Sequence, residues 1–432
     1  MSETPQQTEI GEFPSTWEVD RVDSSFDIQQ GKQVSKRNRD GEHQRPFLRT
    51  KNVFWNRLEL NDLDQMHFSA AEQSRLELRM NDLLVCEGGS IGRTALWNNE
   101  VDGCLYQNHL HRLRAKGDKV HPQFGVYWLW YAFDVAKLYF GRGNVTTIPN
   151  LSQSKLAELP MALPPLPEQK KIAHILSTVQ RAIEEQERII QTTTELKKAL
   201  MHKLFTEGLR GEPQKQTEIG LVPESWEVVE LDTTGDVVYG IQAAVANNIA
   251  AVGTPILTNK NITLDGGFDL EKLNYIELTT KRHTATILQK GDILFNWRSG
   301  SKYHVGKTAY FDLEGEWVHS SFILRIRPAE KINGRYLFYY FNHLREEEFF
   351  VKLQTYAINA KFNASAVNAL PTAVPGREEQ NEVAAVLDSA QKKIDNAEQK
   401  HRALLDLFRT LLHELMTAKT RVHDLKLRTQ DV

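Results

Sequence analysis

The sequence has few cysteines, no long hydrophobic run and almost no net charge. Only two cysteines occur in 432 residues, Cys86 and Cys104, which argues against a disulfide scaffold or a zinc ribbon and fits a reducing compartment. The longest apolar stretch has about eight residues, whereas a membrane-spanning helix needs about 20. The N-terminal segment MSETPQQTEI lacks the basic and apolar regions of a signal peptide. We therefore expect a cytoplasmic protein with no membrane partner.

The sequence also lacks the common signatures of catalysis. The segment GSKYHVGKT resembles a phosphate-binding loop, but five residues separate Gly300 from Gly306 where that loop has four, so we interpret these glycines as turn residues. No nucleophile elbow, zinc-protease helix or dinucleotide fingerprint occurs. We interpret His109 and His111, near Cys104, as exposed imidazoles on a strand rather than as metal ligands. With a net charge of −3, nucleic acid could bind only to local patches.

The sequence does contain an internal repeat. Residues 7–22 and 216–231 are identical at nine of sixteen positions, which chance does not produce. Residues 168–206 and 379–417 are identical at 12 of 39 positions. Each half thus has a short entry segment, a domain of about 140 residues and one long segment. The framework is kept while the domains have diverged. The pattern therefore predicts one scaffold that carries two domains, each of which recognises a different target.

The two long segments are predicted to be helices. Apolar residues recur in both at three- and four-residue steps, Pro167 suits a first helical turn, and Gly208 and Gly211 end the first segment. The apolar stripe is narrow and the other faces are charged, as in a coiled coil. The residues expected to pair the helices or to meet partners are Ile172, Leu176, Ile183, Leu200, Leu204, Val383, Leu387, Ile394, Leu411 and Leu415.

Connectivity predicts the architecture. If the apolar stripes pair, the second helix runs antiparallel to the first, and the two domains sit at opposite ends of one coiled coil with a pseudo-twofold relation. Short β-rich runs and one aromatic helix in each copy, over 124–138 and 335–350, indicate domains of mixed α/β class. The predicted order is a first domain over residues 7–160, a central long helix over 165–210, a second domain over 216–372 and a C-terminal long helix over 376–420.

Local basic clusters make DNA the expected ligand of the two domains. Arg, Lys, Asn, Gln and Ser in polar, glycine-rich loops are the side chains that reach base edges and phosphates. A solvated surface is the alternative explanation for any single residue. The candidate DNA-binding residues are Lys32, Lys36, Arg37, Arg39, Arg49, Lys51, Glu87, Ser90, Arg93, Arg142 and Asn144 in the first domain, and Lys260, Arg298, Ser299, Ser301, Lys302, His304, Lys307 and Lys361 in the second.

One pair of aligned positions suggests different base preferences. An alignment of residues 86–90 with 296–301 sets Glu87 near Arg298. Glutamate can accept a hydrogen bond from cytosine N4, and arginine can donate to guanine O6 and N7. Opposite chemistry at matched positions is what two half-sites of different sequence require. The alternative is that both are unrelated surface charges.

Several motifs stand out along the chain. They are the entry segments Trp17-Glu18-Val19 and Trp226-Glu227-Val228, the runs Gly291-Asp292-Ile293-Leu294 and Arg298-Ser299-Gly300-Ser301, and Pro164-Pro165-Leu166-Pro167-Glu168-Gln169 at the first long helix. With the duplicated order of parts, these motifs resemble the specificity subunit of type I restriction–modification systems, and the resemblance covers nearly the whole chain. The second copy departs from the pattern over 375–380, and Cys86-Glu87-Gly88 departs from the family's usual arginine-bearing loop.

The resemblance implies a chain with no catalytic centre, metal or cofactor of its own. Each domain would read one half of a bipartite site in double-stranded DNA, and the coiled coil would set the gap between the halves. Two modification (methyltransferase) subunits would dock on the chain, hold S-adenosylmethionine and methylate adenine. Restriction subunits that use ATP and magnesium would join them. The implied location is the cytoplasm of a bacterium or archaeon.

Three alternatives stay open at this point. A related system with a fused methyltransferase–nuclease would use a similar specificity subunit. A non-enzymatic coiled-coil scaffold would bind other proteins through the two domains and would not retain DNA of a particular sequence. An enzyme with an unrecognised site is the third.

Overall fold

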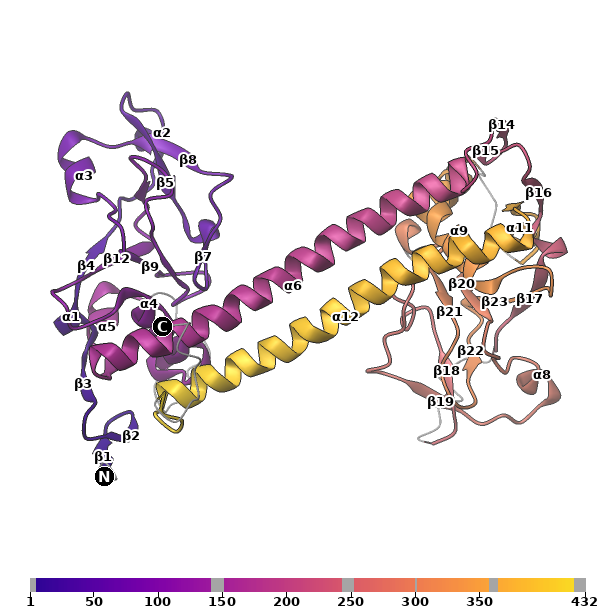
Figure 1. The fold of residues 1–432 in the computed structure, drawn as a ribbon. Helices are drawn as coiled ribbons and strands as arrows, with labels where there is room; N and C mark the ends of the chain where they lie inside the picture. The colour runs from indigo at the N-terminus through magenta and orange to yellow at the C-terminus, as the bar shows by residue number, and fades with distance from the viewer. Residues whose placement is uncertain (1–4, 141–150, 243–251, 300, 357–363, 423–432) are drawn as a thin grey trace. The chain divides into compact units, whose positions relative to one another are not determined.

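The computed structural model describes residues 5–140, 151–242, 252–299, 301–356 and 364–422. The chain forms two compact units, of which the first comprises residues 1–187 and 399–432 and the second residues 188–398. Each unit combines one of the two domains with part of each long helix, so the long helices contribute to both units. Figure 1 shows the course of the chain and the labels of the elements.

Unit 1 is built on an antiparallel sheet of four strands in the order β10-β9-β12-β4. These strands are β10 (Thr94–Leu96), β9 (Leu83–Cys86), β12 (Leu110–Ala115) and β4 (Phe26–Gln30). A three-stranded sheet contains β11 (Leu105–Tyr106), β5 (Gln44–Leu48) and β8 (Asp64–His67). Two-stranded sheets pair β1 (Pro5–Thr8) with β2 (Gly11–Pro14), β3 (Glu18–Arg21) with β13 (Pro160–Leu163), and β6 (Val53–Phe54) with β7 (Arg57–Leu58).

Short helices complete unit 1. They are α1 (Val22–Ser25), α2 (Lys36–Arg39), α3 (Ala70–Arg75), α4 (Pro122–Trp130) and α5 (Gln153–Ala157). The predicted aromatic helix over 124–138 is wrong at its C-terminal end. There α4 gives way to a π-helical turn (Tyr131–Val135), and Lys137 adopts a positive φ of 53° that ends the helical run before a 3-10 turn (Leu138–Phe140).

Unit 2 repeats this plan. Its four-stranded sheet has the matching order β21-β20-β23-β17, formed by β21 (Thr308–Tyr310), β20 (Ile293–Asn296), β23 (Ile323–Pro328) and β17 (Gly235–Tyr239). The three-stranded sheet contains β19 (Asn274–Ile276), β18 (Thr254–Leu257) and β22 (Val318–His319). The two-stranded sheets pair β14 (Gln214–Thr217) with β15 (Gly220–Pro223) and β16 (Glu227–Glu230) with β24 (Pro371–Val374).

Besides parts of the two long helices, the described residues of unit 2 form α8 (Lys281–Thr284), α9 (Gly334–Glu346), α10 (Phe349–Tyr356) and α11 (Ala364–Asn368), with 3-10 turns at Leu231–Thr233 and Lys302–His304. The single helix predicted over 335–350 is wrong, because Glu348 has a positive φ of 57° and separates α9 from α10. The sheets and helices confirm the predicted mixed α/β class and the internal repeat.

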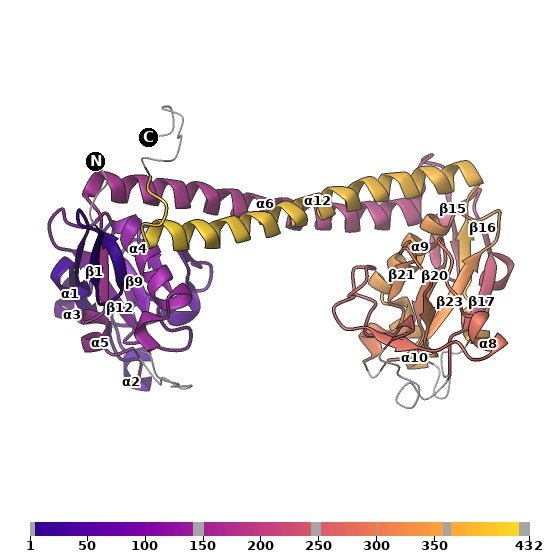
Figure 2. The same cartoon turned by 90° about the horizontal axis from the view of Figure 1, so that it is seen from below.

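The central sheet of each domain separates two apolar cores. Side chains alternate across a strand, so neighbouring residues point to opposite faces. In unit 1, Leu83 and Val85 of β9 pack in the core that contains α4, while Leu84 and Cys86 pack on the other face. In unit 2, Ile293 and Phe295 of β20 face α9, as the neighbouring β20, β21 and α9 in Figure 2 illustrate. A strand buried on both faces reads as a continuous apolar run, which explains the β-rich patterns in the sequence.

The two long helices are α6 (Leu166–Glu207) and α12 (Arg377–Met416). In unit 1 they lie antiparallel, because Glu187 contacts His401 at 3.2 Å while Glu168 contacts Arg421 at 2.9 Å. In unit 2 they are again antiparallel, because Lys197 donates to Gln391 and Glu379 accepts from the backbone N–H of Leu209. The predicted pairing of two long antiparallel helices is thus confirmed within each unit.

The residues of the predicted apolar stripe are covered where the long helices pack in the cores of the two units. Ile172, Leu176, Ile183, Leu204, Val383, Leu387, Ile394 and Leu415 are buried, and Leu200 and Leu411 are half-buried and pack against the cores. Two leucines at matched positions of the repeat, Leu196 and Leu407, are instead 54% and 45% exposed. These two leave apolar surface on the helices uncovered.

The repeated Glu-Gln pair at the start of each long helix has a structural role in this fold. Glu168 accepts from the indole Nε1–H of buried Trp17 at 3.2 Å, and Glu379 accepts from Trp226 at 3.3 Å. Gln169 donates to the carbonyl oxygens of Lys119 and Pro164, and Gln380 repeats this with Lys331 and Pro375. The motif that marks the helix start therefore ties the helix to the entry segment and to the domain.

Candidate nucleic-acid interface

The clearest exposed cationic feature in unit 1 is the helical turn α2. Ser35 caps it by accepting from the backbone N–H of Asn38, which orders a turn that contains Lys36, Arg37 and Arg39. These three cationic residues are exposed, and no ion pair holds them within the part of the chain that the structure describes. Free cations on an ordered turn suit contacts with phosphate oxygens.

Arg49 and Lys51 are cationic but already paired with carboxylates. Arg49 Nη1 lies 2.7 Å from Asp64, and Lys51 Nζ lies 2.6 Å from Asp62. Burial acts to raise the pKa of Asp64, but the hydrogen bond and charge of Arg49, with Lys51, hold that pKa below its usual value. Both cations are partly exposed, so contact with DNA would compete with these surface pairs. In unit 2, Lys260 is exposed at the position that matches Lys51.

Two predicted DNA contacts are engaged inside the fold. Lys32 donates to Glu72 and to the carbonyl oxygen of His67, both at 2.7 Å, and its side chain is 11% exposed. Lys307 is 7% exposed and donates to the carbonyl oxygens of Asn259 and Ile262. Because both ammonium groups already hold acceptors within the domain, neither offers a free cation to DNA in this structure.

A polar cluster occupies the ends of β4, β9 and β12 in unit 1. Glu87, the residue after β9, accepts from Gln30 Nε2 at 3.2 Å and lies 3.5 Å from His109 Nδ1. The carboxylate is more buried than a base-reading residue would be, since its side chain is 12% exposed, whereas that of His109 is 50% exposed. The geometry therefore makes His109 the outward-facing member of the cluster and Glu87 its positioning residue.

Strand register identifies the matched positions in unit 2. Cys86 pairs with Leu110 as Asn296 pairs with Ile323, and Gln30 pairs with His111 as Tyr239 pairs with Leu324. Three residues of unit 2 thus correspond to Gln30, Glu87 and His109 of unit 1, and all three are aromatic: Tyr239, Trp297 and Phe322.

Two of the aromatic counterparts contact each other, and the third is exposed. The Tyr239 and Trp297 rings meet edge to face with centroids 5.6 Å apart, and Phe322 is 41% exposed. The alignment of Glu87 with Arg298 is therefore wrong, because the register sets Trp297 at that position.

The same comparison explains the glycines that imitate a phosphate-binding loop. Gly92 N–H donates to the Cys86 carbonyl, and Gly306 N–H donates to the Asn296 carbonyl. Both have a φ of +83°, and a Cβ at either would lie 2.2 Å from a phenylalanine ring, Phe133 or Phe350. The glycines are therefore required by turn geometry and packing. The loop between the matched strand end and this glycine is longer in unit 2. For that reason the alignment of residues 86–90 with 296–301 was shifted from the structural register.

The remaining candidates are distributed over these loops. Ser90 is exposed, and Arg93 lies over the Phe54 ring at 5.1 Å. Arg298 and His304 are exposed in the unit 2 loop, Ser299 and Ser301 are half-buried there, and Lys302 begins its 3-10 turn. The candidates Arg142, Asn144 and Lys361 lie outside the described residues. His111 is fully buried with Nε2 2.9 Å from the Leu151 carbonyl oxygen, so its expected exposure is wrong.

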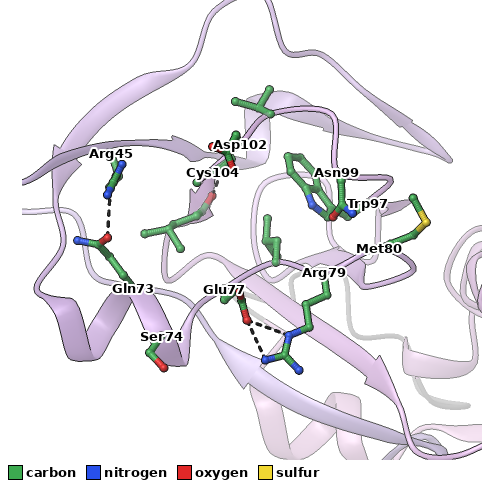
Figure 3. A pocket seen from close by; sticks show the side chains of 14 residues that line it. Arg45, Gln73, Ser74, Glu77, Arg79, Met80, Trp97, Asn99, Asp102 and Cys104 are labelled. Carbon is green, nitrogen blue, oxygen red and sulfur yellow. Dashed lines mark hydrogen bonds and ion pairs between the residues drawn. The ribbon is translucent and has the colours of Figure 1, made fainter.

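A polar cavity of about 770 Å³ lies in unit 1 beside α3 and β11 (Figure 3). Two of its arginines hydrogen-bond to neighbouring side chains of the wall, since Arg45 donates to Gln73 at 3.1 Å and Arg79 donates to Glu77 at 2.8 Å. Cys104 lies at its wall, and burial raises the pKa of this thiol to about 12. Such a thiol stays protonated and unreactive near neutral pH.

Comparison with known proteins identifies the class to which this fold belongs. The chain matches the model of the type I restriction modification DNA specificity domain twice, over residues 14–193 and 223–405. The two matches define a duplicated DNA-specificity protein. The chain belongs to the family of type I restriction–modification specificity subunits, which confirms the resemblance seen in the sequence.

Relatives and solved structures agree along the whole chain. It is 25% identical to the putative type I restriction enzyme MjaX specificity subunit of Methanocaldococcus jannaschii over 96% of each protein, and 25% identical to the MjaVIII specificity subunit of the same organism over 95% of each. The fold is similar to that of a crystallised type I restriction–modification S subunit from M. genitalium, with a TM-score of 0.59 and 17% identity over 92% of this chain and 96% of that one.

A further solved chain, from a study of assembly and conformational transition of the type I restriction–modification system, shares the fold. Its TM-score is 0.55 at 16% identity over 94% of this chain and 99% of that one. The relatives are named as specificity subunits, so the prediction of a specificity rather than a catalytic subunit is confirmed. None of the described helices combines the length and apolar character that a bilayer crossing requires.

Proposed function

We propose that this chain is the DNA-reading subunit of a type I restriction–modification complex, in which each domain recognises one half of a bipartite DNA site. The supporting observation is that one framework presents different chemistry at matched strand ends. His109, ordered by Glu87, can exchange hydrogen bonds with base edges, while Phe322 beside Trp297 can contact a thymine methyl group. The exposed cations of α2 would hold the phosphate backbone.

The long helices are proposed to set the gap between the two half-sites. Each helix contributes residues to both units, so its length separates the domains along the chain. A helix rises about 1.5 Å per residue, and DNA rises about 3.4 Å per base pair. Seven added residues would therefore lengthen the spacer by about 10 Å, or about three base pairs.

Other subunits of the system would dock on this chain. The exposed leucines Leu196 and Leu407 occupy matched positions on α6 and α12, which suits two copies of one partner. The proposed partners are two methyltransferase subunits that hold S-adenosylmethionine and methylate adenine, joined by restriction subunits that use ATP and magnesium. The complex would act on DNA in the cytoplasm.

Detection of modified bases across the host genome, with and without this gene, tests the proposal. We expect a bipartite methyladenine motif that disappears on deletion. Persistence of every motif, with the methyltransferase demonstrably expressed, would reject the DNA-reading role and favour a protein scaffold. Neighbouring genes distinguish separate methyltransferase and restriction subunits from a fused methyltransferase–nuclease.

Two exposed-residue variants test the assignment of the half-sites. His109→Ala should relax one half of the motif and leave the other half intact, and Phe322→Ala should do the reverse. Each variant thus serves as the control for the other. If neither variant changed the motif, the bases would be read by residues other than those at the strand ends. The assignment of the chain as the DNA-reading subunit would not be affected.

The spacer proposal needs insertions in both long helices. Because α6 and α12 pair antiparallel within each unit, extra residues in α6 alone would shift one stripe against the other. One heptad after Thr193 and one after Ile394 keep both stripes nearly in phase, since seven residues turn about 20° short of two full turns. The methylated motif should then keep both half-sites and gain about three base pairs of gap. An unchanged gap would contradict the spacer role.

A further inference from the structure

Three side chains able to bind a metal ion converge in unit 2, where α6 meets α9. His202 lies on α6, His343 lies on α9, and Glu347 follows α9 one helical turn later. Their potential ligand atoms all lie within 4.8 Å of one another, and His202 Nδ1 is 2.9 Å from Glu347 Oε1. This cluster is separate from the strand ends proposed to read DNA.

The surroundings of the cluster suit a bound cation. His343 is 7% exposed and its ring stacks on Phe205 at 5.2 Å, which fixes the imidazole in place. His202 and Glu347 have side chains that are 59% and 47% exposed, so they can adjust around an ion. A cavity of about 250 Å³ lined by all three residues leaves room for water as a further ligand.

We propose that His202, His343 and Glu347 form a zinc site that fastens the second domain to the end of α6. Two imidazoles and one carboxylate are a ligand set that Zn²⁺ accepts, with water in the fourth position. Ligand atoms around tetrahedral zinc stand about 3.3 Å apart, so a movement of about 1 Å by the exposed side chains closes the site. The ion would add a coordination link between two elements that also pack together in the core of unit 2.

The first half of the chain provides a matched control. His413 is the residue of the repeat that corresponds to His202. Alignment of α4 with α9 makes Tyr131 and Val135 correspond to His343 and Glu347. His413 lies beside the Tyr131 ring, 6.1 Å between centroids, and its Nε2 is 3.1 Å from Lys419 Nζ. Tyr131 and Val135 supply a phenol and an alkyl group where unit 2 has two ligands, so the described residues around His413 do not form the set of three zinc ligands.

Metal binding by the full, untagged chain tests the proposal. After removal of metal with a chelator, titration with Zn²⁺ should show one tight site, and Co²⁺ should give the intense visible bands of tetrahedral coordination. His202→Ala should weaken Zn²⁺ binding at least about tenfold. His413→Ala should bind like the unaltered chain, which separates this site from adventitious binding by any of the 14 histidines.

A second variant distinguishes zinc binding from a simple hydrogen bond. Glu347→Gln keeps the side-chain volume and a hydrogen-bonding partner for His202 but replaces the charged ligand oxygen with a weak one. It should lose Zn²⁺ affinity by a similar factor while the thermal midpoint of the metal-free chain stays near that of the unaltered protein. The proposal would be overturned if the unaltered chain did not bind Zn²⁺, or if His202→Ala and Glu347→Gln bound it as tightly as the unaltered chain.

Discussion

The carboxylate of Glu379 provides the sharpest test of how the long helices are attached. It is 2% exposed and accepts from two donors, Trp226 Nε1 at 3.3 Å and the Leu209 N–H at 3.0 Å. In Glu379→Gln, one of the two side-chain oxygens becomes an NH₂ group. That NH₂ group then faces either the Trp226 indole N–H or the Leu209 N–H, and this donor loses its acceptor. An unsatisfied buried donor costs about 1–3 kcal/mol. We therefore expect unit 2 to lose about 2 kcal/mol of stability.

Hydrogen exchange by mass spectrometry can localise this loss, because the two units need not unfold together. Peptides that cover residues 205–231 should exchange faster in Glu379→Gln, by about thirtyfold for 2 kcal/mol, while peptides of unit 1 stay unchanged. Glu378→Gln is the matched control, since Glu378 is exposed in the same helical turn. Glu168→Gln should act in the same way on unit 1. A change below about 0.5 kcal/mol in Glu379→Gln would refute the reasoning.

Two further variants probe the glycine turn and a buried histidine. Gly306→Ala should destabilise unit 2 by about 2 kcal/mol or more, because its Cβ would lie 2.2 Å from the Phe350 ring at a φ of +83°, whereas Gly376→Ala meets open space and should be neutral in denaturant unfolding. Burial lowers the pKa of His319 to about 4 from 6.5. The unfolded chain therefore takes up this proton first, and stability present above pH 6.5 is lost as the pH falls toward 4. Between pH 7.5 and 5 the unaltered protein should lose about 2 kcal/mol more than His319→Gln, and equal losses would contradict this pKa.

The repeat made most of the fold predictable. Matching entry segments and helix motifs indicated two copies of one architecture, and the apolar stripe of Ile172, Leu176 and Val383 predicted the helix pairing within each unit. The interruptions of the aromatic helices were not predictable, because they depend on single residues such as Glu348 that adopt a positive φ without being glycine. The aspartate partners of arginines at matched positions, such as Arg114 and Arg327, were also missed. Those pairs join strands that are far apart in sequence.

The candidate site was predicted less well, for two physical reasons. Residue type indicates that Lys32 and Lys307 are cations, but only tertiary structure shows that acceptors within the domain already bind their ammonium groups. The alignment of Glu87 failed because the loops after β9 and β20 differ in length, so gaps could be placed in several ways. Pairing of backbone hydrogen bonds has no such freedom, since a one-residue slip would turn every side chain to the opposite face.

This register is what makes the two domains comparable. His109 directly precedes β12 and Phe322 directly precedes β23. The pairing partners of these two strands match residue by residue, so the difference between His109 and Phe322 is a difference in chemistry on one geometry. At these strand ends the two domains therefore differ in side-chain chemistry, and beyond them they differ in the length of the loop that follows β9 and β20. The repeat therefore supplies an internal reference: exchanging His109 and Phe322 between the domains should alter both half-sites of the motif while the framework that carries them stays the same.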